Sequence, residues 1–258
     1  MEPVLEGRRS LIVGGGGEGI GRAITQAFIA AGSAVAVVDL DPRRADQAAA
    51  AAVDADVPGF AIPGDVRSAP EIDGFVREAT RRLGGLDVVV TVVGGQLAFV
   101  PAARIHEITD DDWDLMFDLN LRYVARVLRA ALPVFLEQRT GGTIVSVGSI
   151  TGMAGSPMQA AYGAAKAGLA SLARSVAAEY SREGIRMNVV SCGPIATPVA
   201  QAAQADTDLE WIPMGRAGTS REVAEAAVFL ASPLSSYISG LSLVLDGGAV
   251  AAGPFPTH

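Results

Sequence analysis

Short apolar runs recur along the chain and alternate with longer, alanine-rich amphipathic stretches. The short runs have the length of buried strands and the longer stretches have the periodicity of helices. The predicted strands lie near residues 10–14, 34–39, 58–62, 86–92, 142–148, 186–191 and 241–245. Strands that alternate with helices form parallel sheets with right-handed crossovers. We therefore predict an α/β fold, a doubly wound seven-stranded parallel sheet with helices on both faces, in a single domain over residues 1–258.

Residues suited to ligand binding fall where the predicted strands end. The residues at or just after a strand end are Gly15, Asp39, Asp65, Gly94, Ser149 and Gly193. In a doubly wound sheet, ligands bind beyond the carboxyl ends of the strands, at the point where the strand order reverses. One edge of the sheet is therefore expected to hold the functional site.

The composition fits a sheet that is covered on both faces. Hydrophobic residues make up 50% of the chain and charged residues only 19%, as expected for buried parallel strands. The mean hydropathy is +0.34, but no apolar run reaches the length of a bilayer span. The chain starts without a basic region followed by a hydrophobic one, and it has a single cysteine. We expect a cytoplasmic protein with no signal peptide and no internal disulfide.

The charge argues against two classes of partner. The net charge is −8 and the isoelectric point is about 4.8, which disfavours binding to nucleic acid and to anionic membranes. Two histidines and one cysteine cannot build a usual zinc site. We therefore expect a small-molecule substrate, with no metal, nucleic acid or membrane partner.

A glycine-rich turn joins the first predicted strand to the first predicted helix. The strand at Arg8–Val13 runs into the glycine run 14–21, and an apolar helix is expected over 20–31. Glycines at such a turn let the backbone approach a pyrophosphate, and the helix N-terminus offers unpaired N–H groups to the anion. The run contains so many glycines that more than one set of them fits the spacing of a dinucleotide-binding turn. The motif alone is therefore weak evidence for such a turn.

Asp39 makes the dinucleotide interpretation more specific. It ends the second predicted strand, 18 residues after Gly21, where a carboxylate can accept hydrogen bonds from the adenosine ribose hydroxyls. The alternative is that Asp39 only helps to start the following helix, together with Asp41 and Pro42.

Ser149, Tyr162 and Lys166 carry the strongest chemical signal. Tyr162 and Lys166 are four residues apart, so a helix would place the phenol and the ammonium on one face. A fixed positive charge lowers the pKa of a phenol, which can then exchange a proton with an alcohol or carbonyl near neutral pH. The same spacing is common on solvated helix faces, so the accompanying motifs decide between the two interpretations.

Together these features resemble the short-chain dehydrogenase/reductase family in its single-domain form, over nearly the whole chain. The matching motifs are the glycine turn with Gly15, Gly19 and Gly21, Asp65-Val66, Asn120, Ser149, the Tyr162–Lys166 pair, Asn188, the segment 193–197 and Leu245-Asp246-Gly247-Gly248. The resemblance implies a Rossmann fold with a cofactor half at about 8–150 and a catalytic and substrate half at about 150–250. It implies that the catalytic residues are Asn120, Ser149, Tyr162 and Lys166. It implies that the cofactor-binding residues are Gly15, Gly19, Ile20, Gly21, Asp39, Asp65, Val66, Gly94, Tyr162, Lys166, Ile195 and Thr197.

The implied activity is hydride transfer between a nicotinamide cofactor and a secondary alcohol or ketone. Tyr162 would exchange the hydroxyl proton while Ser149 holds the substrate oxygen. Lys166 would lower the pKa of Tyr162 and hold the nicotinamide ribose, and Asn120 would anchor a water of a proton relay. Two alternatives remain, a 3-oxoacyl thioester reductase of the same family and a dinucleotide-sensing protein without turnover.

The cofactor is expected to be NAD. A 2′-phosphate beside Asp39 would set two anions against each other. Phosphate-binding relatives typically have a basic residue where this chain has Glu18 or Leu40. The resemblance also implies a homotetramer, formed through the helices in 110–138 and 156–183.

The substrate is expected to be neutral and hydrophobic. The segments expected to line its pocket are 95–100, 151–155 and the lid 198–213 with Trp211, and they contain no Lys or Arg. An anionic handle on the substrate would therefore have no obvious partner. The C-terminal residues 253–258 are expected to form a tail or an arm on a neighbouring subunit.

Three positions depart from the family pattern. The family usually has Thr at Gly14 and Asn-Asn-Ala-Gly at the segment 91–94, and these two polar segments brace each other. Thr91 or the backbone is expected to take over this bracing. Cys192 replaces a common proline, and a small buried hydrophobic role is the simplest interpretation.

Overall fold

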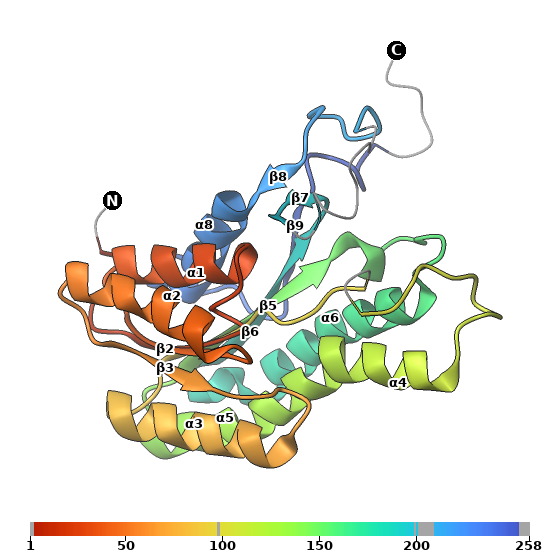
Figure 1. Cartoon of the computed structure of the whole chain (residues 1–258). Helices are drawn as coiled ribbons and strands as arrows, with labels where there is room; N and C mark the ends of the chain where they lie inside the picture. The colour runs from red at the N-terminus through yellow and green to blue at the C-terminus, as the bar shows by residue number, and fades with distance from the viewer. Residues whose placement is uncertain (1–2, 97–98, 199, 201–208, 253–258) are drawn as a thin grey trace.

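The computed structural model describes residues 3–96, 99–198, 200 and 209–252, and it is built around a parallel sheet (Figure 1). The sheet has seven strands in the order β3-β2-β1-β4-β5-β6-β9, and all of its neighbouring strands are parallel. The strand order reverses between β1 and β4. The predicted doubly wound seven-stranded sheet is therefore confirmed.

The predicted strands are all present, together with a short additional pair formed by β7 and β8. The strands are β1 (Arg9–Val13), β2 (Ala34–Asp39), β3 (Gly59–Pro63), β4 (Val88–Thr91), β5 (Gly142–Ser149), β6 (Ile185–Cys192), β7 (Ile195–Ala196), β8 (Gly218–Thr219) and β9 (Ser242–Leu245). The helices are α1 (Ile20–Ala30), α2 (Pro42–Asp54), α3 (Ala69–Leu83), α4 (Asp110–Phe117), α5 (Tyr123–Gln138), α6 (Ala160–Tyr180) and α8 (Ser220–Ala231). A π-helical turn, Asp118–Arg122, joins α4 to α5.

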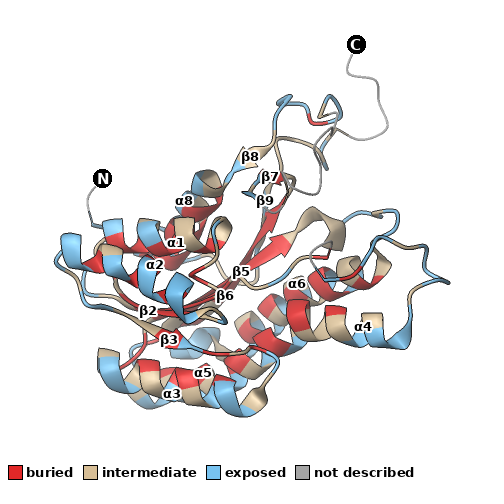
Figure 2. Cartoon of the chain, viewed as in Figure 1, coloured by how far each residue is buried: buried red, intermediate tan, exposed pale blue. Residues whose placement is uncertain are grey.

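Helices cover both faces of the sheet. Figure 1 shows α1, α2 and α8 on one face and α3, α5 and α6 on the other. Two apolar cores result, one between the sheet and the helices α3, α5 and α6, the other between the sheet and α1, α2 and α8. The sides of the helices that face the sheet are buried in Figure 2, whereas their outer sides are exposed. Burial on both faces fixes the strand register, because a slip by one residue would exchange the two sets of side chains.

The helix starts follow from local chemistry. The Asp41 side chain accepts a hydrogen bond from the Arg43 N–H at the start of α2, and Pro42 is the first helical residue. Thr109 and Asp112 form a reciprocal capping box at the start of α4. Each cap satisfies N–H groups that have no partner inside the helix.

Gly14 and Val93 explain the first departure from the family pattern. A Cβ at Gly14 would lie 2.7 Å from Cγ2 of Val93, and the φ of Gly14 is +87°. The valine therefore fills the space that a larger residue at position 14 would need. The backbone braces the two segments, because the Val92 N–H donates to the Val13 carbonyl at 2.9 Å. The Thr91 hydroxyl binds Ser146 of β5 at 2.8 Å, so it braces the sheet on the side away from the glycine turn.

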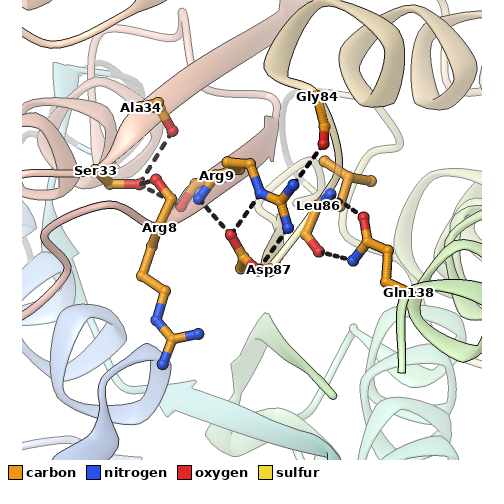
Figure 3. A network of polar contacts seen from close by, with 9 residues as sticks. Arg8, Arg9, Ser33, Ala34, Gly84, Leu86, Asp87 and Gln138 are labelled. Carbon is orange, nitrogen blue, oxygen red and sulfur yellow. Dashed lines mark hydrogen bonds and ion pairs between the residues drawn. The ribbon is translucent and has the colours of Figure 1, made fainter. Parts of the chain in front are cut away.

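A bidentate ion pair ties the start of β1 to the start of β4. Nε and Nη2 of Arg9 bind the two carboxylate oxygens of Asp87 at 2.8 and 3.0 Å, and Figure 3 shows this network. Burial alone would raise the pKa of Asp87, but hydrogen bonds from Arg9 outweigh it and hold the pKa below its usual value. The pair therefore favours the folded state at neutral pH.

We expect Asp87→Asn to destabilise the protein by about 2 kcal/mol at pH 7, because it removes charge-assisted hydrogen bonds. The contribution of the carboxylate is present above its unfolded pKa of about 4 and is lost as the pH falls through the lower folded pKa. Urea unfolding at pH 7 and at lower pH should show the difference from the wild type shrinking in acid. Asp73→Asn, at an exposed helix position, is the control, and a difference that does not change with pH would contradict the assignment.

Candidate functional site

The glycine turn brings the end of β1 close to the start of α1. A Cβ on Gly21 would overlap the carbonyl oxygen of Gly14, so only glycine allows this approach. Gly19 is the N-cap of α1, and no side chain caps the helix. The uncapped N–H groups and the helix dipole make this end of α1 suited to an anion such as a pyrophosphate.

The turn faces the segment that follows β6. A Cβ on Gly19 would lie 3.1 Å from Cγ2 of Thr197. Ile195, in the short strand β7, has only 8% of its surface exposed. Two segments far apart in the sequence, both predicted to bind the cofactor, are thus adjacent in the fold.

Asp39 is held at the end of β2. Its carboxylate accepts one hydrogen bond from the Gly16 N–H and one from the Asp41 N–H, both at 3.1 Å. Asp39 therefore lies against the glycine turn, as a ribose-binding acid should, and it also touches the start of α2, as the alternative requires. Arg43 and Arg44 each pair with Asp41 at 3.8 Å.

Asp65 and Val66 follow β3 at the same edge of the sheet. Arg67 binds the Asp65 carboxylate, with Nη2 at 2.6 Å from Oδ2, and this hydrogen bonding lowers the pKa of Asp65. The Val66 side chain belongs to the apolar core. The cofactor contacts predicted at these two residues would therefore involve a paired carboxylate and the Val66 backbone.

Gly94, Asn120 and Lys166 meet beyond the end of β4. A Cβ on Gly94 would lie 2.5 Å from Oδ1 of Asn120 and 2.9 Å from Nζ of Lys166. Asn120 is fully buried in the π-helical turn. Its Oδ1 accepts from the Gly95 N–H at 2.9 Å, and its Nδ2 donates to the carbonyls of Gly95 and Met116. The Asn120 side chain thus holds the loop after β4 in place.

Ser149 and Tyr162 lie together at the end of β5. The Ser149 Oγ accepts hydrogen bonds from the N–H and the hydroxyl of Thr151, at 3.2 and 2.9 Å. Because both lone pairs of Oγ are used, the Ser149 proton is free to point elsewhere. Burial raises the pKa of Tyr162, and hydrogen bonding to Ser149 partly offsets this rise. The Ser149 hydroxyl is therefore close enough to the Tyr162 phenol to influence its pKa.

Lys166 lies behind Tyr162 with 5% of its surface exposed. Its Nζ donates to the Val147 carbonyl at 3.0 Å and lies 5.7 Å from the centre of the Tyr162 ring. Burial lowers the pKa of Lys166 to about 8. Burial dominates the environment of the Tyr162 phenol and raises its pKa, so the lowering of that pKa by Lys166 stays a prediction.

Cys192 is a buried neighbour of this group. It has 6% of its surface exposed and pairs in register with Ser149 across β5 and β6. Burial raises the pKa of the Cys192 thiol to about 12, against the opposing charge of Lys166. The side chain therefore remains a neutral thiol in the core, as the simplest interpretation of the sequence expects.

Two polar residues at the site were not recognised individually from the sequence. Thr151 orients Ser149 through the hydrogen bonds described above. Gln96 is buried, and its Nε2 donates to the Met158 carbonyl at 3.0 Å, whereas its Oε1 is buried without a hydrogen-bond partner. Both residues belong to segments that were expected to line the pocket, but a side chain's hydrogen-bond partners cannot be read from composition.

The expected lining segments present apolar side chains. In these segments the large hydrophobic residues Phe99, Met153 and Trp211 have more than a third of their surface exposed, as do Met158 and Met214 just outside them. A small apolar cluster of Val100, Met116 and Ala161 packs beside Tyr162. Residues 97–98, 199, 201–208 and 253–258 lie outside the described residues, and these include parts of the expected lining loop and lid and the whole C-terminal tail.

Comparisons with known proteins agree on one family. A family model described as enoyl-(acyl carrier protein) reductase matches residues 15–250. A 3-oxoacyl-(acyl-carrier-protein) reductase of Thermotoga maritima is 34% identical, over 95% of this chain and 99% of that protein. The chain belongs to the short-chain dehydrogenase/reductase family.

Solved structures of this family superpose closely on the chain. A putative short-chain alcohol dehydrogenase from Sinorhizobium meliloti 1021 has a TM-score of 0.89 at 31% identity, over 96% of this chain and 98% of that chain. A 7α-hydroxysteroid dehydrogenase, described as complexed with NADH and 7-oxo glycochenodeoxycholic acid, has a TM-score of 0.87 at 26% identity, over 95% and 94%. The chain is therefore an oxidoreductase of the short-chain dehydrogenase/reductase family, which uses nicotinamide dinucleotides.

The residues at the carboxyl edge fit such a dinucleotide. The backbone approach of Gly21 to Gly14 and the uncapped end of α1 leave room and donors for a pyrophosphate. In the part of the chain that the structure describes, no group of three or more His, Cys, Asp or Glu side chains could hold a metal ion. No helix among the same residues has both the length and the apolar character needed to cross a bilayer.

Gly94 offers a test of how tightly this site is packed. We expect Gly94→Ala to weaken dinucleotide binding by about tenfold or more, because the new Cβ would displace Asn120 and Lys166. Gly95→Ala is the matched control. Its φ of +139° brings similar backbone strain, but its Cβ would meet only Phe99, at 3.8 Å. Calorimetric titration with NADH and NADPH measures the difference, and equal losses in both variants would show that backbone strain alone is responsible.

Proposed function

We propose that the protein is an NAD(H)-dependent oxidoreductase that interconverts a secondary alcohol and a ketone, with a neutral hydrophobic substrate. The observation that carries this proposal is the meeting of Ser149, Tyr162 and Lys166 at the carboxyl edge of the sheet, beside the glycine turn. A nicotinamide bound there would supply or accept the hydride, which is chemistry of the cofactor. The residues of the chain supply orientation and proton transfer.

Proton transfer is assigned to the Tyr162 hydroxyl. In alcohol oxidation this oxygen takes the hydroxyl proton of the substrate, and in ketone reduction it returns a proton to the carbonyl oxygen. Ser149 accepts from Thr151, so its own hydroxyl proton is not used by Thr151 and can be donated to the oxygen of a bound substrate, which places that oxygen beside Tyr162. This orientation is what the Thr151 contacts support.

Lys166 is assigned to the cofactor ribose and to the electrostatics of the site. Its Nζ has donors left after the hydrogen bond to the Val147 carbonyl, and it lies beside Gly94, at the edge where the cofactor is expected. With a pKa of about 8, Lys166 is charged in most molecules at neutral pH. We propose that this charge stabilises the phenolate form of Tyr162, which accepts the hydroxyl proton of the substrate in alcohol oxidation.

The catalytic role of Asn120 is a positioning role in this proposal. Both donors of its side-chain amide are used by the carbonyls of Gly95 and Met116, so a water of the proton relay would be held by the neighbouring backbone. The π-helical turn widens the helix at this point, which is a usual feature of functional sites.

The apolar lining supports a hydrophobic substrate. The exposed apolar side chains of Phe99, Met153, Met158, Trp211 and Met214 lie in or next to the segments expected to form the pocket. Arg216, just beyond them, binds Glu222 at 2.7 Å, so its charge is already compensated. One structural relative is described in complex with a 7-oxo bile acid, and the apolar ring system of such a molecule would suit these walls, with its carboxylate outside the pocket.

The main alternative is a 3-oxoacyl thioester reductase. It is favoured by the name of the Thermotoga maritima relative, and a thioester carrier would keep its charge outside the pocket. Turnover of an acyl thioester with a clear preference for NADPH would support this alternative. A sensor without turnover is disfavoured, because Asn120, Ser149, Tyr162 and Lys166 are all present.

The assembly and location of the protein remain predictions. In the helices expected to form the tetramer interface, the apolar residues Val124, Leu128, Leu169 and Val176 are buried within the subunit. Their apolar character is therefore explained by the core, and the homotetramer rests on the family resemblance. A cytoplasmic location likewise rests on the sequence.

We expect Tyr162→Phe to abolish turnover while leaving dinucleotide affinity nearly unchanged, because the hydroxyl acts on the transition state. A panel of alicyclic, steroidal and aliphatic alcohols and ketones identifies a substrate for the assay. Tyr180→Phe, at the end of the same helix, is the control. Activity of Tyr162→Phe within about tenfold of the wild type would overturn the assignment.

We expect NAD to be preferred over NADP by about a hundredfold or more in kcat/KM, as a repulsion of a few kcal/mol would give. Asp39→Ala should narrow this gap mainly by improving the use of NADP. Asp46→Ala removes the same charge from an exposed position on α2 and should leave the gap intact. Comparable wild-type kcat/KM for the two cofactors at one pH and ionic strength would show that Asp39 does not face the ribose.

A further inference from the structure

A pocket of about 170 Å³ lies at the amino edge of the sheet, where the parallel strands begin. Its walls include residues at the starts of β1, β4, β5 and β6 and residues that follow α8. The strand β5 has 8 residues, so at about 3.3 Å per residue the two edges of the sheet are more than ~20 Å apart. The pocket is therefore separate from the candidate catalytic site.

Two arginines, Arg8 and Arg186, are among the residues that line this pocket. Asp87 is the one acidic residue among its lining residues. Both carboxylate oxygens of Asp87 are bound by Arg9, so this acid is already neutralised. The pocket thus carries excess positive charge, although the net charge of the chain is −8.

Arg186 is held by neutral groups. Its Nη1 donates to the Ile238 carbonyl at 3.0 Å, and its Nη2 donates to the Thr143 hydroxyl and the Leu230 carbonyl at 3.1 and 3.2 Å. Burial lowers the pKa of Arg186, and the charge of Arg8 lowers it further. These contacts orient the guanidinium but leave its positive charge uncompensated.

Arg8 has no such partners. In Figure 3 its side chain points away from the network of Arg9 and Asp87. Among the described residues, its guanidinium makes no hydrogen bond or ion pair within the usual distances. The fold therefore brings two like charges to one cavity, at a cost that an anion between them would remove.

We propose that this pocket binds a phosphate group, either free phosphate or the phosphate of a small ester, between Arg8 and Arg186. Guanidinium groups match tetrahedral oxyanions through paired N–H donors. The volume of about 170 Å³ is many times the ~10–15 Å³ of such space that one water molecule needs, so a group of this size fits. Thr140 and Ser236 also line the pocket, and each carries a hydroxyl that can donate a hydrogen bond.

The test is thermal unfolding of the full chain, titrated with sodium phosphate at constant ionic strength set by sodium chloride. We expect a saturable rise of Tm in the wild type, because a ligand that binds only the folded state stabilises it. Arg8→Gln should weaken the apparent phosphate affinity by about tenfold or more, as for the loss of a charge-assisted hydrogen bond. The control Arg77→Gln removes an exposed arginine of α3 and should behave as the wild type.

Measurements without phosphate keep the proposal falsifiable. In that buffer Arg8→Gln should be at least as stable as the wild type, because it removes repulsion of Arg186. A clear loss of stability would show that Arg8 is a structural residue and would overturn the proposal. Equal phosphate effects on all three proteins would do the same, because they would indicate binding at the glycine turn or a general salt effect.

A second titration identifies the source of the phosphate group. Glycerol 3-phosphate that binds more tightly than inorganic phosphate, with the same loss in Arg8→Gln, supports an ester ligand. The reverse order supports free phosphate. All variants keep the glycine turn, Ser149, Tyr162 and Lys166, and the readout is stability, so the result is independent of the proposed oxidoreductase activity.

Discussion

Parallel pairing of the strands is the constraint on which the rest of the structure depends. Every strand of the main sheet runs in the same direction, so all amino ends lie at one edge and all carboxyl ends at the other. Both faces of the sheet are buried under helices, which prevents the register from slipping. Residues as distant in sequence as Gly15, Asp39, Gly94 and Ser149 are brought to one edge by this pairing.

The two edges of the sheet carry ionisable side chains of different kinds. At the carboxyl edge, Lys166 and Tyr162 are buried beside each other. Burial raises the pKa of Tyr162 and lowers that of Lys166, so it favours the neutral form of both side chains. At the amino edge, arginines remain charged, and two of them, Arg9 and Arg186, are held by Asp87 and by backbone carbonyls respectively. A proton-transferring group needs a pKa that its surroundings can move, whereas guanidinium groups provide charge that does not depend on pH. The residue types at the two edges therefore suit proton transfer at the carboxyl edge and constant positive charge at the amino edge.

The sequence predicted the positions of the strands and the gathering of the strand-end residues at the carboxyl edge of the sheet. Both follow from local periodicity and from motifs at strand ends. The sequence could not predict contacts that depend on packing. The π-helical turn that orients Asn120 has no local signal, and the pKa of Tyr162 depends on burial by segments far along the chain. The same holds for the pairing of Arg9 with Asp87 and for the approach of Arg8 to Arg186, which arise from strand order rather than from neighbouring residues.

The contact between Gly14 and Val93 restricts the order in which this chain could acquire the more usual family residues. Threonine at position 14 clashes with Val93 and requires a change of the +87° backbone angle, so it is unfavourable as a first step. Alanine at position 93 only leaves a small cavity, at a cost of about 1 to 2 kcal/mol. A lineage, or an engineer, moving between the two forms must therefore change position 93 first, so these two positions are expected to vary together among related sequences.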